Sequence, residues 1–311
     1  MKARRVAGST KTTQAREQRL EEVRATARRA LVAGDATEPN KIDVDHIAAA
    51  YGADVEFDDL EGATARVIQV RDRAKIVVST RIAEIGSIRF SIAHEIGHLL
   101  CQHYMRRGSA DRAIERLCSP LSIAGTSAER EASVFATELL MPTAMVTPWC
   151  KVAPRSLDPV RSIASAFQTS LLASALRFVE LTPERCAVVY SELGRVRWVK
   201  KSPSFTAWIP KGRTLEPGSA AFDYFEGGAL ENSSRIIPAV TWLPRAAKVS
   251  DSPMYEHATA IPGAGTVFSL LWIPTPPKDR PLRARSSVHA RPSAQADRRT
   301  PDQDPESREQ Q

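Results

Sequence analysis

His94, Glu95 and His98 are spaced as HExxH inside the most hydrophobic helical pattern of the chain. At 3.6 residues per turn, positions four apart lie on one helical face, so both imidazoles can reach one metal ion. Glu95 is rotated away from the ligand face and toward a water on the metal. It can accept the proton of that water and return it to a leaving amine. The spacing therefore predicts a catalytic zinc centre, and the alternative is a pair of partly buried core histidines.

A catalytic zinc ion usually has three protein ligands, so the two histidines need a third. Five downstream side chains are candidates: His103, Glu115, Glu129, Glu131 and Glu138. The last three belong to one predicted helix, residues 128–140. Its apolar face favours Glu129 as the inward carboxylate and places Glu131 and Glu138 on the solvent side. A carboxylate in a first helical turn is also typical of a surface residue that interacts with the helix dipole, which is the alternative for Glu129.

The composition is that of a globular protein. The chain has 311 residues, of which 42% are hydrophobic and 25% charged, and this length suggests about two domains. The net charge of +7 is concentrated in residues 1–30, which hold nine basic and three acidic side chains. The rest is nearly neutral, which argues against nucleic-acid binding by the whole protein. Four isolated cysteines favour reduced thiols in a cytoplasmic protein, and no apolar run reaches the roughly 18 residues of a membrane span.

Hydrophobic periodicity predicts an α+β protein. Helical spacing recurs in five regions: residues 16–32, 44–51, 85–103, 128–140 and 158–181. The last region divides at residues 168–170 and resembles a helix-turn-helix in outline. Short runs rich in Val and Ile predict a small antiparallel sheet from residues 54–57, 64–70 and 75–79. Residues 104–127 are expected to be irregular.

A second, mostly β domain is predicted in the C-terminal half. Its expected strands are residues 187–190, 195–199, 207–209, 240–243 and 266–272. Its aromatic residues either form a core or line a ligand pocket: Trp198, Phe205, Trp208, Phe222, Tyr224, Phe225 and Trp242. The last 36 residues have almost no apolar content and are expected to be disordered.

Two segments resemble the motifs of a known family. FSIAHEIGHLL (residues 90–100) and EREASVFATELLMP (residues 129–142) are similar to RFxxAHExGHxL and ExxANxFAxxLLMP of the ImmA/IrrE metallo-endopeptidases. The resemblance implies a zinc ion, with manganese as an alternative, bound by His94, His98 and Glu129, with Glu95 catalytic. Ser133 replaces the Asn of the family motif and is the candidate for a hydrogen bond that supports the ligands. His103 is given no role, because many members place a histidine one residue earlier.

The longer, IrrE-type members imply an arrangement for the rest of the chain. By resemblance, a zincin-like metallopeptidase core is followed by a helix-turn-helix-like linker and a mostly β, GAF-like regulatory domain. The expected parts are a flexible basic tail (residues 1–15), the peptidase domain (16–150), the linker (155–182), the GAF-like domain (185–275) and a disordered tail (276–311). Such members cleave a helix-turn-helix repressor (XRE type) in bacteria and so induce stress-response or mobile-element genes. The resemblance implies the same substrate class here.

The rival hypothesis is a transcriptional regulator that binds DNA or a repressor without cutting it and holds a structural zinc ion. A structural site normally has four Cys or His ligands, and Glu95 would have no function in it. As a DNA reader, the predicted helix 171–178 offers only Ser174 and Arg177 as clear polar contacts. We therefore expect direct DNA binding to be weak or absent, and no membrane partner. The sheet over residues 54–79 is expected to present an edge to an extended substrate.

Overall fold

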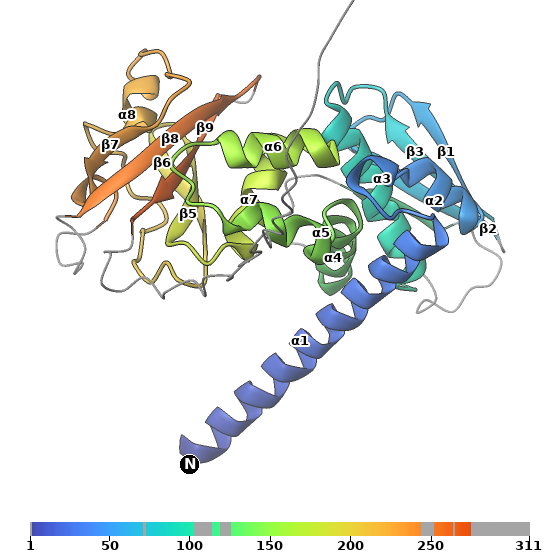
Figure 1. The fold of residues 1–311 in the computed structure, drawn as a ribbon. Coiled ribbons are helices and arrows are strands. Elements are labelled where there is room, and N and C mark those ends of the chain that lie inside the picture. The colour runs from blue at the N-terminus through green and yellow to red at the C-terminus, as the bar shows by residue number, and fades with distance from the viewer. Residues whose placement is uncertain are drawn as a thin grey trace, which may run out of the picture. The chain divides into compact units, whose positions relative to one another are not determined.

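The computed structural model describes residues 2–70, 73–102, 114–118, 126–243, 252–263 and 265–274 (Figure 1). Side chains are described from residue 13 onward, except at residues 69, 70 and 114–118. The α-helices are α1 (Lys2–Ala33), α2 (Val44–Ala50), α3 (Ile85–Leu100), α4 (Ser127–Leu140), α5 (Thr143–Val146), α6 (Asp158–Phe167), α7 (Leu171–Leu181) and α8 (Ala220–Phe225). The strands are β1 (Ala53–Asp58), β2 (Ala65–Val70), β3 (Arg73–Ser79), β4 (Ile114–Cys118), β5 (Cys186–Glu192), β6 (Arg195–Lys201), β7 (Arg235–Pro238), β8 (Pro253–Ile261) and β9 (Thr266–Trp272). Short 3-10 helices lie at Pro39–Lys41, Thr147–Lys151 and Ala239–Thr241. These elements form a mixed α+β fold, as expected.

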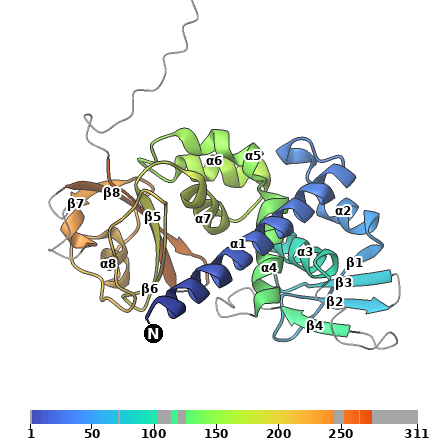
Figure 2. The same ribbon diagram turned by 90° about the horizontal axis from the view of Figure 1, so that it is seen from below.

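The first sheet has the strand order β1-β3-β2-β4 over its described strands (Figure 2). β2 is antiparallel to both β3 and β4, as predicted for β2 and β3, whereas β1 is parallel to β3. The prediction of an antiparallel sheet was therefore wrong for β1, and the sheet is mixed. The reason is that β3 inserts between β1 and β2, and its Ile76 pairs with Val55 on one side and Val67 on the other. β3 is thus interior, and β1 and β4 are the edge strands among the described strands of this sheet.

β4 lies in the region that we expected to be irregular. It pairs with β2 in the register Val67↔Arg116 and Ile68↔Glu115. A strand stabilised mainly by a partner about 50 residues away carries little local signal, because its hydrogen bonds come from the sheet and not from its own sequence. The other residues of the 104–127 segment lie outside the described residues, apart from the start of α4.

α1 is one helix from Lys2, where a flexible tail over residues 1–15 was expected. The predicted start at residue 16 differs because hydrophobic spacing marks only the part of a helix that packs, and Val23 is the first buried residue described on α1. Val23, Ala27 and Ala30 form a buried stripe on α1, and α1 packs against α4. Among the described residues, no helix is both long enough and apolar enough to cross a membrane.

The two helices predicted at residues 158–181 are confirmed as α6 and α7. Gln168, in the turn between them, has a left-handed φ of 52°, and the Ser170 hydroxyl accepts the Ala173 N–H as an N-cap. α3 ends at Leu100, three residues earlier than predicted, and Gln102 beyond it has a left-handed φ of 57°.

The second sheet has the order β6-β5-β9-β8-β7, with antiparallel neighbours throughout its described strands. Two predicted strands are absent from the described structure: residues 207–209 are irregular, and residues 240–243 include the end of a 3-10 helix. β7 and β8 were missed. β8 contains Glu256 and His257, whose polarity hides the strand pattern although both side chains are buried.

Those two polar residues are buried because the tertiary structure supplies their hydrogen bonds. The Glu256 carboxylate accepts the backbone N–H groups of Ala220 (2.9 Å) and Ala221 (3.3 Å) at the start of α8. His257 Nδ1 accepts the backbone N–H of Leu157, just before α6, at 3.2 Å. Burial raises the pKa of Glu256 and lowers that of His257, since a buried site disfavours the charged form of each.

Five of the seven aromatic residues of this domain belong to one hydrophobic cluster: Phe205, Phe222, Tyr224, Phe225 and Trp242. Trp198 packs with the core that includes α7, stacked on Tyr190 at a ring distance of 4.9 Å. Phe205 and Trp242 are the buried aromatic residues of the first cluster, which also contains the start of α8. Trp208 is 66% exposed. Most of these residues are therefore core residues, and the GAF-like character of the domain stays a prediction.

The described cysteines are free thiols, and we expect them to be unreactive in the folded protein. Burial raises the pKa of Cys101 and Cys150 to about 11 and that of Cys186 to about 12. Two pKa units above the ordinary value of 9.0 reduce the thiolate population at pH 8 by about 100-fold. In a Cys118→Ser variant, a thiol reagent should therefore react slowly at pH 8, faster as the pH approaches 11, and at once in urea. Rapid reaction of the folded protein at pH 8 would contradict this expectation.

Candidate metal centre

α3 positions the HExxH residues inside the protein. Its Ile92, Ala93 and Ile96 belong to the hydrophobic core and fix the rotation of the helix. With this rotation Glu95 and His98 are fully buried, and His94 is 7% exposed. The predicted hydrophobic helix is confirmed, and it places both imidazoles on one face.

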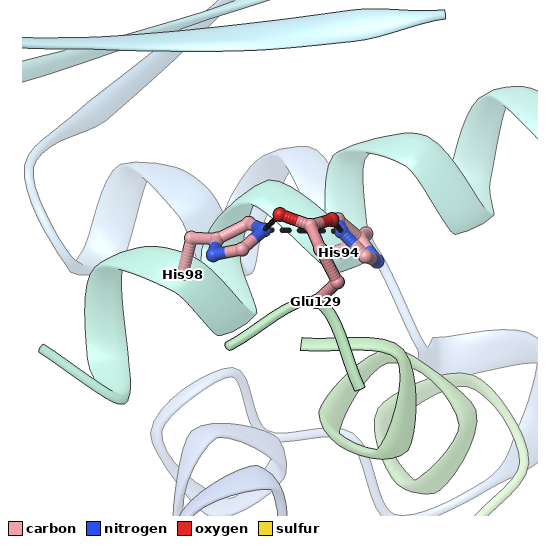
Figure 3. Close-up of side chains that lie close together, drawn as sticks. All are labelled: His94, His98 and Glu129. Atoms are coloured by element: carbon pink, nitrogen blue, oxygen red, sulfur yellow. Dashed lines mark hydrogen bonds and ion pairs between the residues drawn. The ribbon is translucent and has the colours of Figure 1, made fainter. Parts of the chain in front are cut away.

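Glu129 joins the two histidines from the first turn of α4 (Figure 3). Its Oε2 lies 3.2 Å from His94 Nε2, and its Oε1 lies 3.5 Å from His98 Nε2. The two Nε2 atoms are 3.1 Å apart. One ligand atom from each residue lies within 4.8 Å of the other two. The structure therefore brings together the three residues that the sequence analysis selected.

Two local features let α4 deliver Glu129 to this place. The hydroxyl of Thr126 accepts the Glu129 N–H at 3.4 Å and begins the helix. Gly97 lets α3 and α4 cross closely, because a Cβ atom there would lie 3.1 Å from Ala132 Cα and from Phe135 Cβ. A larger residue at position 97 would push α4 away from α3, and Glu129 with it.

The donor set fits a catalytic metal ion. Two imidazole nitrogens and one carboxylate are a known ligand set of catalytic zinc, which keeps a further position open for water or substrate. Hydrogen bonds from His94 and His98 lower the pKa of Glu129 well below its ordinary value. Glu129 is therefore charged at neutral pH, as a ligand to a divalent cation must be.

Ser133 supports this arrangement from one turn further along α4. Its hydroxyl donates to the Glu129 carbonyl oxygen at 2.8 Å, and its oxygen lies 3.4 Å from His94 Nδ1. Because the hydroxyl proton is directed to the carbonyl, the oxygen is left to accept the proton of His94 Nδ1. In the metal-bound protein this tautomer would present an unprotonated Nε2 to the ion, in place of the Nε2–H that hydrogen-bonds Glu129 without the metal.

We expect Ser133→Ala to weaken zinc binding by about 10-fold, the lower end of the effect of removing a hydrogen bond to a metal ligand. Competition with a chromophoric chelator measures the affinity. Ser162→Ala is the matched control, because the Ser162 hydroxyl makes the same bond to the carbonyl four residues earlier on α6, away from the cluster. Equal zinc affinity of the Ser133 variant and the wild type would remove the orienting role.

The prediction that Glu131 and Glu138 face solvent was wrong. They are 8% and 1% exposed. Arginines of α1 and α7 cover these two side chains: Arg19 pairs with Glu131 at 2.9 Å, and Arg177 pairs with Glu138 at 2.6 Å. Periodicity marks one apolar face but does not show that a second face is buried through ion pairs.

The remaining third-ligand candidates cannot be compared with Glu129. His103 lies outside the described residues, and Glu115 lies on β4, where only the backbone is described. Arg177 is the residue whose role the sequence analysis missed. It was considered only as a DNA contact, yet its side chain is buried and bound to Glu138. Burial of Ser174 as well leaves α7 without the polar contacts proposed for DNA reading.

The fold and the cluster define an α+β protein with an HExxH-type candidate metal centre completed by a glutamate from a second helix. Residues 48–178 match the Peptidase M78 family model, described as the IrrE N-terminal-like domain. The match contains both sequence motifs and extends through most of α7. Residues 48–178 therefore form an IrrE-type peptidase domain, as the two sequence motifs predicted.

Comparison with solved structures supports the architecture beyond the matched domain. The chain is similar to a Mycobacterium tuberculosis transcriptional regulator, with a TM-score of 0.52 and 15% sequence identity over 82% of this chain and 81% of the other. At this identity the likeness concerns the fold alone. No curated protein matches the sequence.

Proposed function

We propose that the protein is a zinc-dependent endopeptidase that cleaves a helix-turn-helix repressor of the XRE type and so induces stress-response or mobile-element genes. The observation that carries the proposal is the meeting of His94, His98 and Glu129, with ligand atoms within 4.8 Å, in a domain of a peptidase family. Peptide hydrolysis also needs a general base, and the HExxH pattern supplies one in Glu95, which is buried in the same helix.

The residues of the site would divide the reaction as follows. His94, His98 and Glu129 hold the metal ion, and Ser133 fixes the His94 tautomer. A bound zinc ion supplies Lewis-acid polarisation of the scissile carbonyl and of water. Glu95 accepts the proton of the attacking water at its carboxylate and then delivers it to the leaving amide nitrogen. The buried position of Glu95 keeps this proton from exchanging freely with bulk water.

The substrate class rests on the family resemblance. The structural neighbour, described as a transcriptional regulator, is compatible with a role in gene regulation. An extended substrate segment would add to β1 or β4, the edges of the first sheet. β1 has an exposed Phe57 for such a contact. The C-terminal sheet is the candidate regulatory domain.

The test uses purified full-length protein and the helix-turn-helix regulators encoded beside its gene. We expect the wild type to contain about one zinc ion per chain and to cut one regulator at a defined site, identified by mass spectrometry of the fragments. Removing the metal with a chelator should stop cleavage, and adding zinc or manganese back in separate reactions shows which ion restores it. Stable binding of an uncut regulator by the metal-loaded protein would instead favour the non-cleaving regulator.

A further inference from the structure

We propose that Arg177 of α7 is a positioning residue for the metal site: through its buried ion pair with Glu138, it holds α4 where Glu129 completes the cluster with the histidines of α3. This inference rests on the metal site of the proposed function. It assigns a role in that site to the helical pair that resembles a helix-turn-helix in outline.

Arg177, Glu138, Met141 and Thr143 form a buried group of hydrogen bonds, which we call the joint between α7 and α4. Arg177 and Glu138 are 3% and 1% exposed, and Arg177 Nη2 lies 2.6 Å from Glu138 Oε2. Arg177 Nε also donates to the carbonyl oxygen of Met141, the C-cap of α4, at 3.0 Å. Thr143 adds two bonds to Glu138, from its hydroxyl to Oε2 at 2.7 Å and from its N–H to Oε1 at 3.2 Å. Arg28 of α1 also reaches Oε1, at 3.4 Å. A buried charge with so many directed hydrogen bonds permits little movement.

The joint acts on Glu129 because α4 is a rigid rod. Glu138 lies nine residues after Glu129, about 14 Å along the helix axis. Between them, at Ala132 and Phe135, α4 crosses α3 in contact with Gly97. A displacement of the Glu138 end would therefore tilt α4 about this crossing and move Glu129 in the opposite direction. Fixing one end of the helix fixes the ligand at the other.

α7 can position α4 relative to α3 because α7 is itself held against α3. The turn before α7 lies so close to the start of α3 that a Cβ atom on Gly86 would be 2.4 Å from Ser170 N and 2.6 Å from the Thr169 carbonyl carbon. The Thr169 hydroxyl lies 2.7 Å from that of Ser174, which ties the turn to α7. The start of α3 thus contacts the turn that begins α7, and the end of α4 is bound by Arg177 of α7. Both helices that carry metal ligands are therefore held by α7.

The experiment compares zinc affinity and metal geometry in Arg177→Lys and in the double variant Arg177→Met with Glu138→Gln, which leaves no unpaired buried charge. Affinity is measured by chelator competition, and the visible spectrum of the cobalt-substituted protein reports the coordination geometry. We expect the double variant to bind zinc about 10-fold more weakly with an altered cobalt spectrum, and the lysine variant to lose less.

Glu256→Gln is the matched control, because it changes another fully buried carboxylate in the same way but in the C-terminal sheet, away from α4. It should lower the thermal midpoint while leaving zinc affinity and the cobalt spectrum unchanged. Folded Arg177 variants with wild-type affinity and spectrum would overturn the positioning role alone. A wild-type protein that binds no zinc would overturn the proposed function, and this inference with it.

Discussion

Replacing Glu95 with glutamine is expected to lower kcat for cleavage of the repressor by about 10²–10⁴-fold, the usual contribution of a general base, while zinc content stays at the wild-type level. The amide keeps the size of the side chain in its fully buried position but cannot accept a proton. His94, His98 and Glu129 retain their donor atoms, so the metal site is preserved. Single-turnover cleavage, followed by the appearance of fragments, measures the effect on the chemical step.

Glu84→Gln is the matched control for this variant. Glu84 precedes the same helix and is exposed, and its carboxylate accepts only a local hydroxyl, from Ser87 at 2.7 Å, among the bonds described for it. Its cleavage rate should match that of the wild type. Full activity of the Glu95 variant would rule out a general base at this position, whereas loss of zinc together with activity would show a structural role.

Replacing Gly86 with alanine is expected to lower the free energy of unfolding by about 3 kcal/mol, the upper end of the usual cost of overpacking. The new Cβ atom would meet backbone atoms of Thr169 and Ser170 at 2.4–2.6 Å, and backbone cannot turn aside as a flexible side chain can. The start of α3 would have to separate from the α6–α7 turn. Urea unfolding followed by circular dichroism measures the change.

Gly62→Ala is the control, because it replaces a glycine where the new Cβ atom meets no other described atom, so any loss of stability comes from backbone conformation alone. A Cβ atom at Gly62 has no described neighbour within 4 Å, and the only cost is its positive φ of 73°. That cost is about 1 kcal/mol. If Gly86→Ala were as stable as the wild type, the close approach of the turn to α3 would be incorrect, and the argument that α7 is held against α3 would fall.

The sequence was sufficient for the parts of the site that depend on one helix. The spacing of His94 and His98 is a property of helical geometry, and the apolar residues around them have to face the core. Glu129 was selected by the same reasoning on a second helix, together with the family motif. The structure confirms that these three side chains meet.

The sequence was insufficient where a residue depends on a distant partner. Glu138 is buried because Arg177, 39 positions later, neutralises it, and Glu131 because Arg19, 112 positions earlier, reaches it. Likewise, Glu256 is buried because it accepts the N–H groups that begin α8. The spacing of apolar residues predicts such polar side chains to lie at the surface, because this spacing contains no information on which charges will pair.

Local sequence thus determined the HExxH helix, the capped start of α4 and the type of most helices and strands, because backbone preferences and amphipathic spacing act over a few residues. Only the tertiary structure decided three features. These are the mixture of parallel and antiparallel pairs in the first sheet, the burial of Glu131 and Glu138 on α4, and the ion pair of Arg177 with Glu138. Strand order and ion pairing bring together residues that lie far apart in the chain, and the free energy of those contacts exists only once the chain has folded.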